Sequence, residues 1–244
     1  MHTVCIVQQR LGSTRYPSKA LANIQGKPLT WHVLRRIQGT EGIDALVLAV
    51  PDEGSRTQRL VEIGDSLCVP VEVVPGDPSD LLHRHTQVAL KYHAARIIRI
   101  PGDNPCADPT EIERIIRHAD ARIGSWQWLI TNLDRNVLGN GYPAGLGAEV
   151  YDIRFLAWLD RNATEPAHRE HPHRWAFDNH RVETIECPDA IRRPELDFSV
   201  NTPEDLEFIR SIYATLYPTH PNFTAEQVIR LLEGRAKHLR PPRE

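Results

Sequence analysis

Residues 8–19, near the start of the chain, gather side chains suited to binding phosphate. Three cations, Arg10, Arg15 and Lys19, lie among a glycine and the hydroxyl side chains of serine and threonine. A nucleoside triphosphate carries about four negative charges near neutral pH, and cations with exposed backbone N–H groups stabilise such an anion. The spacing fits neither the dinucleotide-binding glycine pattern nor the P-loop pattern. We therefore predict a phosphate-binding loop of another kind, with a solvated basic loop as the alternative.

A second candidate is Asp103, which follows Gly102 just after an apolar run at residues 96–100. A carboxylate at the end of a strand, opposite a cationic loop, is suited to holding Mg²⁺ on phosphates, because hard cations prefer oxygen ligands. Aspartate in a turn is also a common structural residue. The residues alone leave both interpretations open.

Apolar patterning predicts the elements that must position these residues. Short β-branched runs predict strands at residues 3–7, 45–50, 71–74, 96–100 and 128–131. We predict helices at residues 28–37, from Asp77-Pro78 to about residue 92, and after Asp108-Pro109, Thr202 and Thr224. Strands that alternate with helices predict a mainly parallel sheet, and ligands of such sheets bind beyond the carboxyl ends of the strands.

The pattern loosens in the second half of the chain. Residues 139–195 form a polar stretch rich in proline and histidine, with possible strands near residues 148–151 and 182–187. We interpret residues 1–244 as a single α/β domain. Within it, we interpret residues 139–195 as an excursion that covers the active site and contributes to a homodimer contact.

Composition excludes several functional classes. The net charge of −3 provides no global positive field for nucleic acid or an anionic membrane. The four cysteines are scattered without a C-x-x-C pair, which argues against a disulfide framework or a zinc ribbon. The first apolar run is too short for a signal peptide or a membrane span. We expect a cytoplasmic protein that binds neither nucleic acid nor membrane.

Six blocks of sequence, in order, resemble the CMP-sugar synthetases. They are residues 8–19 with 25–29, 76–84, 99–105, 145–150, 169–171 and 200–206. The resemblance spans almost the whole chain and covers acylneuraminate and octulosonate cytidylyltransferases, and especially the SpsF-like branch for spore-coat polysaccharide. It implies a Rossmann-like, three-layer nucleotidyltransferase fold. It also implies Mg²⁺-dependent transfer of CMP from CTP to an acidic sugar or related small metabolite, with release of pyrophosphate.

The resemblance assigns roles to individual residues. It implies catalytic roles for Arg10, Arg15, Lys19 and Asp103, nucleotide contacts from Gln8, Gln9, Gly12, Ser13 and Arg84, acceptor contacts from Glu149, Arg169 and His171, and Mg²⁺ ligation by Asp103 and Asn201. Cytosine would be read by the backbone at residues 7–9 and by the loop near Pro75.

The chain departs from the family pattern in two places. Asn201 stands where the family usually has aspartate, and an amide oxygen can coordinate Mg²⁺ but brings no charge. In the block ending at Glu149, Ala144 and Gly147 replace two aspartates of the family. These departures bear on the acceptor's identity more than on the reaction.

Three other functions stay open. A nucleotide-sugar glycosyltransferase would normally show a D-x-D pair, which the segment Asp120-Ala-Arg122 does not provide. A nucleotidyltransferase for another nucleoside triphosphate would share the cationic loop and Asp103. A non-catalytic relative would bind CTP without releasing pyrophosphate.

Overall fold

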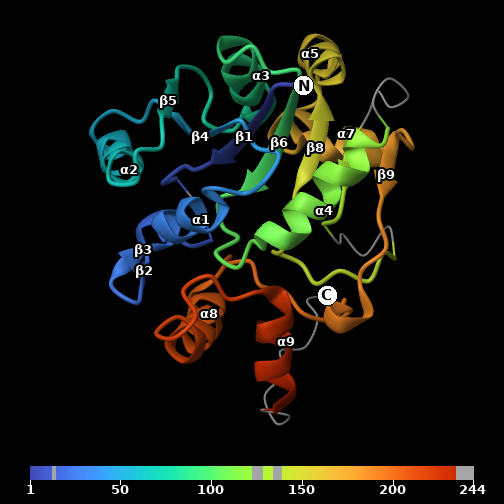
Figure 1. Cartoon of the computed structure of the whole chain (residues 1–244). Coiled ribbons are helices and arrows are strands. Elements are labelled where there is room, and N and C mark those ends of the chain that lie inside the picture. Colours follow the sequence, from blue (N-terminus) through green and yellow to red (C-terminus); the bar gives the residue numbers. More distant parts are fainter. Residues whose placement is uncertain (13–14, 123–128, 134–138, 235–244) are drawn as a thin grey trace.

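A central sheet organises the computed structural model, which describes residues 1–12, 15–122, 129–133 and 139–234. In these residues seven strands lie in the order β5-β4-β1-β6-β8-β7-β9 (Figure 1). They are β1 (Thr3–Gln8), β4 (Ala45–Pro51), β5 (Val71–Val74), β6 (Arg96–Pro101), β7 (Leu129–Thr131), β8 (Glu149–Asp152) and β9 (Val182–Thr184). Of these strands, β8 alone runs against its neighbours, so the predicted mainly parallel sheet is confirmed. Residue 128, the predicted start of β7, lies outside the described residues.

Helices cover both faces of the sheet. One face carries α1 (Leu29–Ile37), α2 (Ser55–Asp65), α4 (Pro109–Asp120), α8 (Pro203–Leu216) and α9 (Ala225–Gly234), and the other carries α3 (Leu81–Lys91), α5 (Ile153–Asn162) and α7 (Pro172–Asp178). In β1, Cys5 and Val7 enter the first core while Val4 and Ile6 enter the second, because alternate side chains of a strand point to opposite faces. The three-layer fold is therefore confirmed.

The order of the strands changes direction at β1. The chain runs from β1 to β4 and β5 on one side and then returns to form β6 on the other side. Gln8 pairs with Pro101, so β1 and β6 end at the same level. In open α/β sheets such a switch point leaves a crevice beyond the strand ends, which is where ligands bind.

The predicted helix starts are confirmed at three places. Asp108 caps α4 by accepting from Thr110 N, and Thr202 and Asp205 form a capping box on α8. At the start of α9, Thr224 N donates to Gln227 Oε1 at 2.9 Å and Gln227 N donates back to Thr224 Oγ1 at 3.3 Å. These side chains satisfy backbone N–H groups that have no partner inside the helix.

The predicted start of α3 at Asp77-Pro78 is wrong. The cap is Asp80, whose carboxylate accepts from His83 N at 3.0 Å. The Asp77 carboxylate instead accepts from Ser79 N at 2.8 Å, which forms a turn before the helix. Aspartate favours such local turns over helix because its short side chain competes for backbone N–H groups.

The stretch at residues 139–195 is more regular than the sequence suggested. It contains α5 and α7, with the short helix α6 (Pro166–Glu170) between them, and the 3₁₀ helix η2 (Asp189–Ile191). Its strand β8 lies inside the sheet, between β6 and β7. The predicted role of this stretch in acceptor binding and dimerisation stays a prediction.

Two further features concern the chain as a whole. Cys5, Cys68, Cys106 and Cys187 are all free thiols. No helix in the described part of the chain combines the length and the apolar character needed to cross a membrane.

Candidate active site

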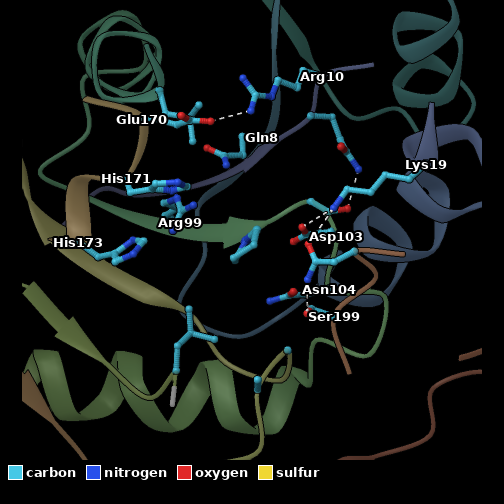
Figure 2. Close-up of a pocket in the computed structure, with 18 of the residues that line it drawn as sticks. Gln8, Arg10, Lys19, Arg99, Asp103, Asn104, Glu170, His171, His173 and Ser199 are labelled. Carbon is cyan, nitrogen blue, oxygen red and sulfur yellow. Dashed lines mark hydrogen bonds and ion pairs between the residues drawn. The ribbon is translucent and has the colours of Figure 1, made fainter. Parts of the chain in front are cut away.

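A cleft opens beyond the carboxyl ends of β1 and β6, at the switch point of the sheet (Figure 2). Its volume is about 390 Å³. Among the described residues its lining has five cations, Arg10, Arg15, Lys19, Arg84 and Arg99, and two carboxylates, Asp103 and Glu170. This excess of positive charge, in a chain whose net charge is −3, favours a polyanionic ligand.

Gly102 allows the two strand ends to approach each other closely. A Cβ atom at this position would lie 2.1 Å from the carbonyl oxygen of Gln8 and 2.6 Å from Gln9 Cδ. Gln9 Nε2 in turn donates to the carbonyl oxygen of Gly102 at 2.5 Å. This close contact holds Asp103, the next residue, beside the end of β1.

Lys19 connects three segments that are far apart in the sequence. Its ammonium lies 2.7 Å from Asp103 Oδ2, 2.7 Å from the carbonyl oxygen of Val200 and 3.3 Å from Asn201 Oδ1 (Figure 2). Arg15 Nη2 donates to the same Asn201 oxygen at 3.1 Å. The predicted catalytic residues Arg15, Lys19 and Asp103 and the predicted metal ligand Asn201 therefore meet at one point.

The loop backbone explains how Lys19 reaches this point. Ser18 adopts a left-handed conformation, with φ of 58°, immediately before the 3₁₀ helix η1 (Lys19–Leu21). Ser18 N donates to the carbonyl oxygen of Leu11 at 3.1 Å, which closes the loop, and Ala20 is fully buried. These contacts aim the Lys19 side chain across the ends of the strands.

Arg10 and Arg84 lie together on another side of the cleft. Arg10 Nη2 forms an ion pair with Glu170 Oε1 at 2.7 Å (Figure 2). Arg84 Nη2 donates to the carbonyl oxygen of Pro78 at 3.0 Å, and Arg10 Nη1 lies 3.5 Å from the same oxygen. Burial and the positive charge of Arg10 lower the pKa of Arg84. Two guanidinium groups held this close favour a bound anion between them.

The other predicted nucleotide contacts differ in position. Gln8 and Gln9 line the cleft. Gly12 lies against Glu53 instead, since a Cβ atom on Gly12 would come within 3.2 Å of Glu53 Oε1. Glu53 Oε2 accepts from Leu11 N at 3.1 Å, so this carboxylate holds the start of the loop. Ser13 lies outside the described residues.

The three predicted acceptor residues are not together. His171 lines the cleft, and Glu149 is buried, with 1% of its surface exposed. Arg169 is not part of the described lining. Its Nε donates to Asp80 Oδ2 at 2.8 Å, its Nη2 to Asp160 Oδ1 at 2.7 Å, and its Nη1 to the carbonyl oxygens of Asp160 and Ala163. A substrate contact by Arg169 stays a prediction.

Sequence reasoning missed Arg99, Glu170 and His173 as residues of the cleft. Of the three, Arg99 carried the strongest signal in the sequence, because it interrupts the apolar run of β6. An arginine inside an apolar strand is informative, since arginine is almost never fully buried unless it is paired. Glu170 lies in the matched block 169–171 but was assigned no role, and His173 lies outside the matched blocks; α6 and α7 place them, and neither helix was predicted.

The donor set at Asp103 is compatible with a divalent metal bound together with phosphates. In the described part of the chain, no group of three or more His, Cys, Asp or Glu side chains is arranged to hold a metal alone. Mg²⁺ is usually bound by one or two carboxylates, with water and substrate phosphates completing its shell. Asp103 and Asn201 direct oxygens to one point already occupied by the Lys19 ammonium, so a cation fits the charge there.

Comparison with known proteins decides the family. The family model described as cytidylyltransferase matches residues 4–228. The chain belongs to the cytidylyltransferase family. A cytidylyltransferase is a CTP-dependent nucleotidyltransferase, so the chain is an enzyme of this class and its resemblance to the CMP-sugar synthetases is confirmed.

Individual relatives and solved structures agree with this result. The spore coat polysaccharide biosynthesis protein SpsF of Bacillus subtilis (strain 168) is 29% identical over 238 residues, which cover 93% of this chain and 92% of the relative. A solved cytidylyltransferase from Leptospira borgpetersenii serovar Hardjo-bovis (strain JB197) superimposes with a TM-score of 0.85, at 22% identity, over 97% of this chain and 95% of that one. A synthetase of CMP-2-keto-3-deoxy-manno-octonic acid, solved with CTP, has a TM-score of 0.68 at 18% identity, over 88% and 99% of the two chains.

Proposed function

We propose that this cytidylyltransferase transfers CMP from CTP to an acidic sugar or a related small metabolite and releases pyrophosphate. The observation that supports the proposal most is the meeting of Lys19, Asp103 and Asn201 at the ends of β1 and β6. This point combines a cation for phosphate with oxygens for a metal, inside a cleft with excess positive charge. The SpsF relative supports a role in polysaccharide biosynthesis.

The proposed reaction requires little covalent chemistry from the protein. An acceptor oxygen forms a bond to the α-phosphorus of CTP, the bond to the α,β-bridging oxygen breaks, and pyrophosphate leaves with the electron pair. Lys19 and Arg15 would neutralise charge on the phosphates from one side, and Arg10 from the other. Positioning and electrostatic stabilisation are the main sources of rate in transfer at phosphorus. An acceptor that attacks through an ionised oxygen needs no general base.

Asp103 and Asn201 are the residues that would hold Mg²⁺ with the nucleotide. When bound, the ion would supply further neutralisation of phosphate charge. Asn201 is held for this role by its own N–H group, which donates to Asp205 Oδ2 at 2.8 Å at the start of α8. Because Asn201 brings no charge, Asp103 would carry most of the metal affinity.

Gln8, Gln9 and Arg84 would contact the nucleoside part of CTP. Gln8 is the last residue of β1, Gln9 follows it, and both line the cleft, while Arg84 is 3% exposed and donates to the loop that precedes α3. A cytoplasmic location and a homodimer stay predictions.

Calorimetric titration with CTP, ATP, GTP and UTP, each with and without Mg²⁺, tests the proposed function. We expect tight binding of CTP alone and only with Mg²⁺, followed by pyrophosphate release when the right acid acceptor is added. Preference for another nucleoside triphosphate would favour a nucleotidyltransferase that uses that nucleotide. Preference for a sugar nucleotide would favour a glycosyltransferase. CTP binding with no pyrophosphate release across a panel of sugar acids and sugar phosphates would favour a non-catalytic relative.

A further inference from the structure

Arg99 is a buried guanidinium in the wall of the cleft. It lies opposite Glu149 in the antiparallel pair of β6 and β8, and its Nη1 is 2.7 Å from Glu149 Oε1. The two side chains are 5% and 1% exposed. Burial is the largest single influence and by itself would lower the pKa of Arg99, but its interactions with Glu149, Tyr151 and Asp103 together outweigh burial and raise it. Arg99 is therefore charged at every physiological pH.

Glu149 does not accept from all the hydrogen-bond donors of Arg99. A guanidinium has five N–H donors, and a buried donor without an acceptor is costly. Arg99 Nε is fully buried, and no group in the described residues accepts a hydrogen bond from it. Glu149 also has other partners, because its Oε2 accepts from Tyr151 OH at 2.8 Å and its Oε1 lies 3.3 Å from His173 Nδ1.

The surroundings of Arg99 suit a second anion beside the nucleotide. His171 and His173 line the cleft next to it, with ring centroids 5.6 Å apart (Figure 2). Ala144 and Gly145, which also line the cleft, carry no charge. Figure 2 shows these histidines and Arg99 on one side of the cleft, and Lys19 with Asp103 on the other.

We propose that Arg99, flanked by His171 and His173, binds an anionic oxygen of the acceptor, from a carboxylate or a phosphate, and thereby selects acceptors that carry one. This inference rests on the proposed function, since it gives the cleft a second substrate beside CTP. It also replaces Arg169 as the arginine that holds the acceptor, because all three nitrogens of Arg169 already donate to protein oxygens.

The test uses nitrogen-15 NMR of the whole protein saturated with CTP and Mg²⁺. Acetate and inorganic phosphate are titrated separately, with acetamide as the uncharged match of acetate. The signals to follow are Arg99 Nε–H and the imidazoles of His171 and His173. We expect saturable shifts with acetate or phosphate and none with acetamide. The anion that binds more tightly, acetate or phosphate, shows whether the acceptor presents a carboxylate or a phosphate.

Two variants separate the anion site from the fold. Arg99→Lys keeps the charge beside Glu149 and should weaken binding of the anion about tenfold, because lysine lacks the planar guanidinium that donates two parallel hydrogen bonds. Arg99→Met combined with Glu149→Gln removes both charges and should abolish saturable shifts at the histidines. Arg154→Lys is the matched control, since Arg154 also pairs with a carboxylate of β8, Asp152, but lies away from the cleft. CTP affinity should stay unchanged in every variant.

Three results would overturn the proposal. The first is that the wild type shows no saturable shift, and the second is that the double variant Arg99→Met, Glu149→Gln shows the same shifts as the wild type. The third is that Arg99→Lys loses CTP affinity in parallel with anion binding. The last result would assign Arg99 to the triphosphate. If the wild type fails to bind CTP while acetate still shifts Arg99, the proposed function fails and the anion site itself stands.

Discussion

At the scale of single residues, Lys19 and Asp103 depend on each other. The Lys19 side chain is 13% exposed and that of Asp103 is 27% exposed, so both charges are partly removed from water. Each charge lowers the cost of placing the other in the cleft before any ligand arrives. A nucleotide with Mg²⁺ would let the lysine turn to phosphate and the carboxylate turn to the metal, because each new partner has the same sign of charge as the old one.

Asp103→Asn should reduce turnover at least about 100-fold, because the variant loses the one carboxylate proposed to hold the metal. The fold should be retained, since the backbone carbonyl of Asp103 still accepts from Val200 N at 2.8 Å. The measurements are pyrophosphate release against Mg²⁺ concentration and the melting temperature. Asp52→Asn, at the residue that follows strand β4, is the control and should leave both unchanged. Near-normal activity of Asp103→Asn would remove Asp103 from the site.

At the scale of elements, Arg169 joins three helices. It lies on α6 and donates to Asp80, which caps α3, and to Asp160 on α5. The same five-residue helix carries Glu170, which pairs with Arg10 across the cleft. A helix this short has little stability of its own. The position of one wall of the cleft therefore depends on this arginine.

Arg169→Ala should lower the free energy of unfolding by about 2 kcal/mol, because it removes charge-assisted hydrogen bonds and takes the arginine partner away from two partly buried carboxylates. Urea denaturation measures this change. Arg230→Ala is the control, since Arg230 forms an exposed i,i+4 pair with Glu226 and should cost no more than about 0.5 kcal/mol. Unchanged stability of Arg169→Ala, together with a raised KM for the acceptor, would instead support direct substrate contact.

At the scale of the whole molecule, a buried histidine lies on each side of the sheet. His32 belongs to α1 and His85 to α3, and both are 1% exposed. Burial lowers the pKa of His32 to about 4, and burial together with the charge of Arg99 lowers the pKa of His85 to about 3. Their ordinary value is 6.5. Both are therefore neutral in the folded protein at pH values where the unfolded chain takes up protons.

The protein should lose stability as the pH falls from about 6.5 toward 4. Below pH 6.5 the unfolded state binds more protons than the folded state, so each histidine contributes up to about 1.4 kcal/mol of destabilisation per pH unit. Urea denaturation across this range measures the slope. His85→Leu should make the slope shallower, whereas His220→Gln, at an exposed histidine, should not. Identical slopes in the wild type and His85→Leu would contradict the prediction.

Local signals in the sequence were sufficient for most of the fold. Apolar runs located the strands, and caps such as Asp108 and Thr202 located helix starts, because a side chain a few residues away decides each of these features. The same reasoning failed at Asp77 and Asp80, where two aspartates compete for one start. It also missed α5, α6 and α7, and in α6 and α7 proline and histidine interrupt the apolar residues.

The sequence by itself determined the mainly parallel sheet, the cationic loop and the aspartate after β6, since each follows from residues close together in the chain. Only the tertiary structure decided which charges face the cleft. Arg169 and Arg99 look equivalent as residue types, yet every nitrogen of Arg169 donates to a carboxylate or a carbonyl oxygen, whereas Arg99 keeps a buried donor that has no acceptor among the described residues. That difference depends on partners from distant segments, because an ion pair is set by distances in space rather than by spacing along the chain.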